Sequence, residues 1–322
     1  MWVGIGFALA AGMLWGLVFV GPLLLPDYPA ALQSFGRYLA FGLIALPLAW
    51  LDRGELGRLH RSDWIEALKL ALIGNLLYYL FLASAIQRAG APLPTMIIGT
   101  LPVVIAISAN WRNRERDGML PWPRLAPALI LIALGLACVN QVEMSALTAQ
   151  GSDGNTRYLS GAALAIGAVA CWTWYPLRNA DWLRAHPDRN PRAWATAQGL
   201  VTLPLALTGY IGFWTWLIID GNPMPMPFGP RPEVFIGLMV SIGLFASWLG
   251  TLCWNEASQR MPTAVVGQLI VFEMLAALTY AFIWKEQWPD ALTLTGIGLV
   301  LAGVLSALRI KPVRRVSGEP RR

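Results

Sequence analysis

Charge, histidine and cysteine are all scarce in this chain of 322 residues. Charged residues make up 13% of it, against about 25% in an average soluble domain. The two histidines, His60 and His186, lie in charged loops, and the three cysteines are widely spaced within apolar runs. These residues form no metal-binding or redox pattern. The chain also lacks the G-x-x-x-x-G-K-[ST] motif of a phosphate-binding loop. We therefore expect no metal, no other cofactor and no ATP-driven step.

Long apolar runs are what the chain has instead. Apolar residues make up 56% of it, including 16 tryptophans, a residue that collects at membrane–water boundaries. A membrane span needs about 20 residues, and helices are the open structures that satisfy their backbone groups in lipid. We therefore predict an all-α integral membrane protein with ten transmembrane helices. They cover approximately residues 2–25, 30–50, 65–87, 92–111, 124–141, 158–178, 193–219, 232–256, 262–284 and 291–309. No basic segment precedes the first run, so we expect it to remain as helix one rather than to be cleaved.

The distribution of Lys and Arg predicts the orientation. With a cytoplasmic N-terminus, 18 of these residues fall in the inside loops and the tail, and 4 fall in the outside loops. Cytoplasmic loops carry an excess of positive charge, so both termini are expected to be cytoplasmic. The basic tail, residues 311–322, is interpreted as a topology anchor rather than a nucleic-acid site.

An internal repeat divides the ten predicted helices into two groups of five. Gly42-Leu-Ile-Ala-Leu-Pro-Leu-Ala49 matches Gly199-Leu-Val-Thr-Leu-Pro-Leu-Ala206, and Ala85-Ile-Gln-Arg88 matches Ala257-Ser-Gln-Arg260. Helices one and six, and helices five and ten, match in the same order. We expect a first repeat over 1–148 and a second over 157–310. Because five is odd, the second repeat must enter the membrane from the opposite face. Such inverted repeats are typical of transporters that work by alternating access.

The chain resembles the EamA branch of the drug/metabolite transporter superfamily. The resemblance rests on the five-plus-five organisation, Arg37-Tyr38, the Gln-Arg ends of helices three and eight, Glu273 and Lys285-Glu286. The Trp- and Tyr-rich interior is similar to that of the YddG-type aromatic amino acid exporters within this branch. The resemblance implies a bacterial inner-membrane protein that moves amino acids outward. One departure is that Pro102 in helix four has Met274 as its counterpart in helix nine.

Aromatic and polar residues in the middle of the spans are the candidate substrate-binding residues. They would form a cavity with aromatic walls, since rings offer stacking surface and can hold an ammonium group. The alternative is that the same rings only pack against their neighbours. The candidates are Trp15, Tyr78, Tyr79, Met96, Thr100, Trp172, Tyr175, Trp248 and Gln268.

Glu273 is the only acid well inside an apolar span. It is a candidate proton carrier or ligand for a substrate ammonium; alternatively it is hydrogen-bonded, for instance to Tyr280, and stabilises helix packing. Arg37 lies about 10 Å into helix two at 1.5 Å per residue. Snorkelling to the surface or structural pairing is favoured for Arg37 over binding a carboxylate. Pro102 is expected to remove a hydrogen bond from helix four.

These features predict a secondary exporter of aromatic and other large apolar amino acids, with the lipid bilayer and the solute as its partners. Ten spans could enclose a cavity in a monomer. Export of drugs or nucleobase-like metabolites by the same fold is the alternative. A membrane enzyme or scaffold is a weaker one, because paired acids, a Ser–His arrangement and metal ligands are missing from the spans.

Overall fold

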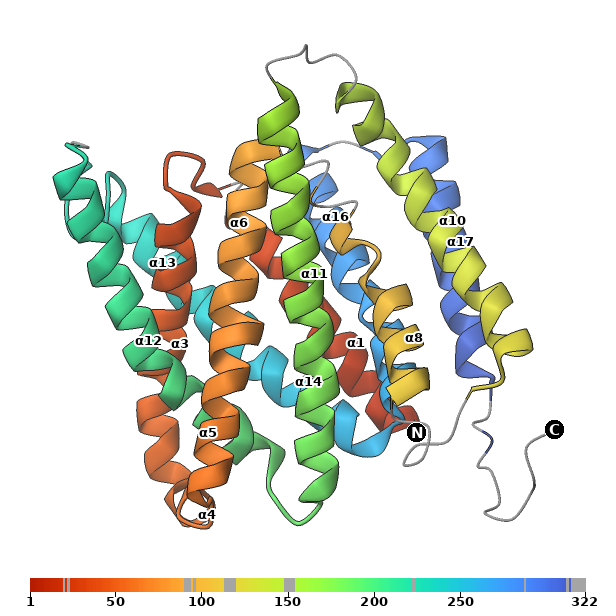
Figure 1. Cartoon of the computed structure of the whole chain (residues 1–322), viewed down its shortest axis with the longest axis horizontal. Helices are drawn as coiled ribbons and strands as arrows, with labels where there is room; N and C mark the ends of the chain where they lie inside the picture. The colour runs from red at the N-terminus through yellow and green to blue at the C-terminus, as the bar shows by residue number, and fades with distance from the viewer. Residues whose placement is uncertain are drawn as a thin grey trace.

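Helices account for all the regular elements of the computed structural model (Figure 1). It describes the chain except for residues 20, 22–23, 90–93, 95–96, 113–119, 148–153, 222–223, 287, 311–312 and 314–322. The prediction of an all-α protein is confirmed for the described part. The helices are α1 (Trp2–Gly16, extended by η1, Leu17–Phe19), α3 (Ala30–Leu51), α4 (Arg53–Leu56), α5 (Arg61–Leu70), η2 (Ala71–Leu77), α6 (Tyr78–Ala89), α8 (Leu101–Arg112), α10 (Trp122–Leu147), α11 (Gly154–Ala185), α12 (Pro191–Ile219), α13 (Pro232–Ile242), η3 (Gly243–Leu249), α14 (Gly250–Arg260), α15 (Thr263–Leu269), α16 (Val271–Lys285) and α17 (Ala291–Leu308).

Five of the described helical segments are long and apolar enough to cross a membrane. They are Trp2–Phe19, Ala30–Leu51, Arg61–Ile86, Pro191–Ile219 and Pro232–Arg260. Shorter apolar helices cover Trp122–Cys138, Thr263–Ala277 and Ala291–Ala307. The count of ten spans therefore stays a prediction.

The predicted helix nine is interrupted at Ile270, which separates α15 from α16. The backbone N–H of Glu273 donates to the Ile270 carbonyl three residues back, so the chain tightens for one turn. The expectation for Pro102 was wrong. Pro102 is the second residue of α8, where a backbone N–H has no partner within the helix. The interruption in helix nine thus arises without proline, and the proline of helix four removes no hydrogen bond.

Two seven-residue segments of π-helix lie inside long helices: η2 continues α5 into α6, and η3 continues α13 into α14. They begin at Ala71 and Gly243, 172 positions apart. Ala85 and Ala257 of the matching sequence segments are separated by the same offset. Asn75 and Ser247 occupy corresponding positions in the two segments, and both are buried. π-Helical turns within α-helices are often found at functional sites.

Two pairs of helices that correspond in the predicted repeat, α3 with α12 and α10 with α17, pack against each other. A Cβ on Gly42 of α3 would lie 2.5 Å from Leu203 Cβ of α12, and a Cβ on Gly199 of α12 would lie 2.7 Å from Ala45 Cβ of α3. The pair α10 and α17 lies side by side at one edge of the molecule (Figure 1) and approaches closely at Gly135 and Gly303. The two contacts in each pair are reciprocal, as expected where a pseudo-two-fold axis relates the helices.

Small residues let α1 approach α16 closely at Gly12 and Gly16, which are one helical turn apart. A Cβ on Gly16 would lie 2.7 Å from Ala276 Cβ and 2.9 Å from the backbone nitrogen of Ala277. We expect Gly16→Ala to destabilise the protein by about 1–3 kcal/mol, because backbone cannot move aside as a side chain can. Gly6→Ala is the matched control on the same helix, since a Cβ there meets nothing within 4 Å. Thermal unfolding in detergent measures the stability of both variants. Equal unfolding midpoints for Gly16→Ala and Gly6→Ala would contradict the close contact between α1 and α16.

Candidate functional site

Four of the predicted aromatic residues meet in one cluster. The Trp172 ring of α11 stacks on Tyr78 at 4.6 Å and on Tyr175 at 5.1 Å, and it meets Trp15 edge-on at 5.3 Å, all between ring centroids. The Trp15 ring also lies 5.1 Å from Trp254 of α14. All five side chains are buried. We call Trp15, Tyr78, Trp172, Tyr175 and Trp254 the aromatic cluster.

Helical spacing and a missing side chain explain how these rings converge. Trp172 and Tyr175 are three residues apart on α11, which places them on one face. A Cβ on Gly74 of η2 would lie 2.2 Å from Tyr175 Cδ2, so the Tyr175 ring occupies the space that a side chain would fill. Tyr78, one turn after Gly74, then faces Trp172. The aromatic cluster therefore depends on both predicted halves of the chain.

Arg37 of α3 lies beside the cluster and is only 8% exposed. Its guanidinium lies 4.8 Å from the Tyr38 ring centroid and 5.4 Å from that of Tyr79, in cation–π geometry. Arg37 Nε donates to Ser247 Oγ of η3 at 2.9 Å. Snorkelling to the surface is therefore wrong for this side chain. The other favoured interpretation, a structural pairing of Arg37, is present as its hydrogen bond to Ser247.

Glu273 is 9% exposed and lies in the first turn of α16. The N-terminal end of a helix carries partial positive charge and tolerates a carboxylate there. A Cβ on Gly12 of α1 would lie 3.0 Å from the backbone nitrogen of Glu273, so the start of α16 packs against the helix that carries Trp15. The expected hydrogen bond from Tyr280 is not formed, because the Tyr280 hydroxyl donates to the Met13 carbonyl at 2.9 Å.

Several buried polar side-chain atoms have no hydrogen-bond partner among the described residues. They include Nε1 of Trp172 and of Trp254, and both amide atoms of Gln268, which is 0% exposed. A buried polar group without a partner costs about 1–3 kcal/mol and calls for an explanation. Two of these three side chains belong to the aromatic cluster, so a bound solute is one such explanation.

A chain of hydrogen bonds continues from the aromatic cluster. Tyr175 donates to Gln198 Oε1 at 3.0 Å, and Asn179 Oδ1 accepts from Gln198 Nε2 at 3.3 Å and from Trp194 Nε1 at 2.9 Å. Asn179 Nδ2 in turn donates to Asn255 Oδ1 at 2.8 Å. The chain joins α11, α12 and α14, all from the second predicted half. It holds the Tyr175 hydroxyl in place.

The remaining predicted residues lie elsewhere or cannot be placed. Trp248 is half-buried and its Nε1 donates to Thr196 Oγ1 at 3.3 Å, so it makes no ring contact with the aromatic cluster. Thr100 is exposed, and its hydroxyl donates to the Ile97 carbonyl at 2.7 Å. Tyr79 meets Tyr38 edge-on at 6.4 Å. Met96 lies outside the described residues.

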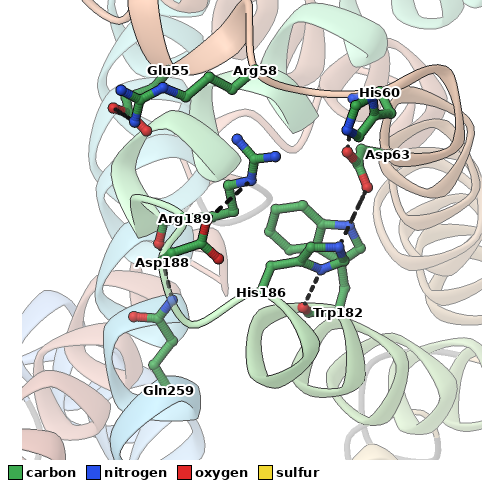
Figure 2. A network of polar contacts seen from close by, with 9 residues as sticks. All are labelled: Glu55, Arg58, His60, Asp63, Trp182, His186, Asp188, Arg189 and Gln259. Atoms are coloured by element: carbon green, nitrogen blue, oxygen red, sulfur yellow. Dashed lines mark hydrogen bonds and ion pairs between the residues drawn. The ribbon is translucent and has the colours of Figure 1, made fainter.

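Polar contacts join the two predicted halves at the end where α1 begins and α17 finishes (Figure 1). Arg178 pairs with Glu66, Arg192 with Asp52, and Arg112 Nη2 with Asp181 Oδ2 at 2.8 Å. Figure 2 shows the same end around Asp63, which accepts from Trp182 Nε1 at 2.9 Å and from the His60 backbone N–H at 2.8 Å. We call these four contacts, Arg178–Glu66, Arg192–Asp52, Arg112–Asp181 and Trp182–Asp63, the end contacts.

The three carboxylates that accept from the second half are well shielded. The side chains of Asp52, Asp63 and Glu66 are 1%, 5% and 10% exposed. Shielding makes breaking such a pair costly, because the carboxylate would remain buried without its partner. The end contacts therefore hold the two predicted halves together in this conformation. The two histidines contribute here, with the His186 ring stacked 4.7 Å from that of Trp182.

Similarity to known proteins identifies the family of this chain. Inner membrane protein YtfF of Escherichia coli (strain K12) is 57% identical to this chain over 309 residues, which are 96% of each protein. The model of the EamA-like transporter family matches residues 2–141. The chain belongs to the EamA-like transporter family. The resemblance to the drug/metabolite transporter superfamily is thereby confirmed, and this EamA-like protein is a membrane transporter rather than an enzyme.

A protein of known crystal structure shares the fold of this EamA-like transporter. It superposes with a TM-score of 0.71 over 94% of this chain and 96% of the other, at 17% sequence identity. At that identity the likeness concerns the fold alone. The family match to residues 2–141 ends close to the boundary predicted between the halves.

The site residues that the sequence did not single out are Tyr38, Ser247, Trp254 and Gln198. Tyr38 adjoins Arg37, and Trp254 lies on a helix stripe with other polar residues. Neither sequence feature tells whether an aromatic side chain contacts a substrate or only packs against other helices. A helix surrounded by other helices has no solvent-exposed face from which its orientation could be predicted.

Proposed function

We propose that this EamA-like transporter exports aromatic and other large apolar amino acids across the bacterial inner membrane by alternating access. The relative named above is an inner membrane protein, which supports this location. The observation that carries the substrate class is the aromatic cluster, whose stacked rings offer flat apolar surface beside buried polar groups. A solute with an aromatic or large apolar side chain and a charged head fits that combination.

Alternating access rests on ten spans in two inverted repeats, with both termini cytoplasmic. The equal offset of the two π-helical segments supports the repeat, as do the reciprocal glycine contacts of α3 with α12 and of α10 with α17. The start of α1 and the end of α17 at one end of the molecule are in keeping with an even number of spans (Figure 1). Inverted repeats place the substrate between the halves and rock around it.

In this proposal the end contacts close the cytoplasmic side. Arg178–Glu66 and Arg192–Asp52 break when that side opens, and their shielded carboxylates then gain water in place of the lost partner. The aromatic cluster lies between the halves and is reached from one side at a time. The proposed lining of the substrate cavity is the set of residues expected from the sequence: Trp15, Tyr78, Tyr79, Met96, Thr100, Trp172, Tyr175, Trp248 and Gln268.

The test is transport by the purified full-length protein in liposomes. We expect exchange of radiolabelled Phe, Trp and Met, and little exchange of Asp or Lys, whose charged side chains cannot enter an apolar wall. Saturation of transport, and its loss on deleting the ring in Trp172→Ala, should accompany the selectivity. No transport of Phe, Trp or Met would overturn the amino acid proposal. Transport of nucleobases or hydrophobic cations in the same assay would favour the alternative substrate class.

A further inference from the structure

Two opposite charges, one from each predicted half, lie buried together without touching. Arg37 of α3 is 8% exposed and Glu273 of α16 is 9% exposed. Neither forms an ion pair with any residue that the structure describes. The Arg37 guanidinium packs on the Tyr38 and Tyr79 rings, and the backbone nitrogen of Glu273 would lie 3.0 Å from a Cβ on Gly12 of α1, about one turn before Trp15 of the aromatic cluster. The two groups are near enough for the charge of Arg37 to act on Glu273. Buried charges are normally paired in direct contact, so this separation calls for a reason.

The guanidinium of Arg37 is held in a fixed position and keeps donors free. Nε donates to Ser247 Oγ at 2.9 Å, and the Tyr38 and Tyr79 rings lie within 5.4 Å of the guanidinium carbon. The other N–H groups of the guanidinium have no hydrogen-bond acceptor among the described residues. A planar fork fixed in this way suits a carboxylate, which it can hold through two parallel hydrogen bonds.

The carboxylate of Glu273 is likewise unused. Within the described part of the chain no side chain donates a hydrogen bond to it, and Tyr280 is engaged with Met13. The start of α16 favours a carboxylate there, because the N-terminal end of a helix carries partial positive charge. A bound ammonium group would supply the missing donors.

We propose, resting on the function proposed above, that Arg37 and Glu273 together bind the zwitterionic head of an α-amino acid. Arg37 holds the carboxylate and Glu273 holds the ammonium. The Cα substituent then extends past Tyr78, whose ring stacks on Trp172 in the aromatic cluster. Because the two charges come from different halves, one ligand bridges the halves. Ser247 acts as a positioning residue that holds Arg37.

Ligands that each lack one charge test this assignment. Binding to the purified full chain in detergent is measured by calorimetry for phenylalanine, for phenethylamine, which lacks the carboxylate, and for 3-phenylpropionate, which lacks the ammonium. The wild-type protein should bind phenylalanine at least roughly 30-fold more tightly than either analogue, as expected when one partner of a buried charge pair is missing.

The variants should respond in a crossed pattern. Arg37→Gln should weaken phenylalanine and 3-phenylpropionate roughly 30-fold or more and leave phenethylamine unchanged. Glu273→Gln should weaken phenylalanine and phenethylamine and leave 3-phenylpropionate unchanged. Ser247→Ala, which keeps both charges, should weaken only the two ligands that carry a carboxylate. Arg231→Gln is the matched control, because that arginine pairs with Asp27 in an exposed loop contact.

The outcomes separate this assignment from the export proposal. Equal binding of all three ligands to the wild type, equal weakening of all three by Arg37→Gln or Glu273→Gln, or no binding of phenylalanine would overturn the zwitterion site. If the two glutamine variants do not fold, the wild-type panel and Ser247→Ala still decide. The crossed pattern without transport in liposomes would retain the site and reject export. Transport of phenylalanine without the crossed pattern would retain the export proposal and reject the zwitterion site.

Discussion

Replacing Asp52 by alanine is expected to loosen the end of the molecule formed by α4 and α5 and to reduce transport. The Asp52 carboxylate is 1% exposed, accepts from Thr196 Oγ1 at 3.0 Å and pairs with Arg192. Breaking a buried pair costs about 3–5 kcal/mol. Because the Arg192 side chain is 48% exposed, water replaces part of the lost contact, and we expect a smaller cost than that, about 2–3 kcal/mol.

Hydrogen exchange of the protein in lipid nanodiscs measures this change. Amides in α5 and in the first turns of α12 should exchange roughly 30- to 100-fold faster, since 1.4 kcal/mol corresponds to a factor of ten. Amides of α10 and α17, which pair at the edge of the molecule, should be unaffected (Figure 1). In liposomes the transport rate should fall, because a transporter that closes one side poorly cannot alternate.

Glu55→Gln is the matched control for Asp52→Ala. Glu55 pairs with Arg58 at 2.9 Å at the same end of the molecule, and Figure 2 shows this pair. Both residues belong to the first half, and Arg58 is 65% exposed, so an effect within about 0.5 kcal/mol is expected. If Asp52→Ala changes exchange no more than Glu55→Gln does, the end contacts do not hold the halves together.

Replacing Trp172 by phenylalanine is expected to weaken transport without the loss of stability that the same replacement causes at Trp194. Trp172 Nε1 is buried without a partner among the described residues, whereas Trp194 Nε1 donates to Asn179 Oδ1 at 2.9 Å. Both replacements remove the same volume and one N–H donor. The difference between them therefore reports the value of the hydrogen bond, which is about 1–3 kcal/mol when a buried partner is left unsatisfied.

Two measurements test whether the Trp172 indole N–H donates a hydrogen bond to a bound solute. Without solute, Trp172→Phe should be more stable to heat than Trp194→Phe by that amount. With solute, Trp172→Phe should raise the KM for phenylalanine about tenfold, as expected from the loss of one hydrogen bond to the solute. An unchanged KM would show that Trp172 only packs. A Trp172→Phe variant less stable than Trp194→Phe would show that its N–H is satisfied in the protein.

Sequence patterns alone located four members of the aromatic cluster: Trp15, Tyr78, Trp172 and Tyr175. Spacings of three and four residues placed Tyr78, Trp172 and Tyr175 on common faces of their helices, and Trp15 was located by its place in the middle of helix one. Trp254, Tyr38 and Ser247 escaped the same reasoning because their contacts, such as that of Ser247 with Arg37, join residues 210 positions apart. Such contacts depend on how helices rotate and cross, which no local pattern encodes.

The sequence by itself determined that this protein is all-helical, lies in a membrane and resembles EamA-like transporters. The reason is that apolar runs of about 20 residues have few structures available in lipid. The tertiary structure decided where charge is buried. It turned Arg37 inward to Ser247, interrupted helix nine at Ile270 without a proline, and placed Glu273 at the start of α16. Burying a charge depends on partners brought from distant helices, so its position is settled only when all of them have packed.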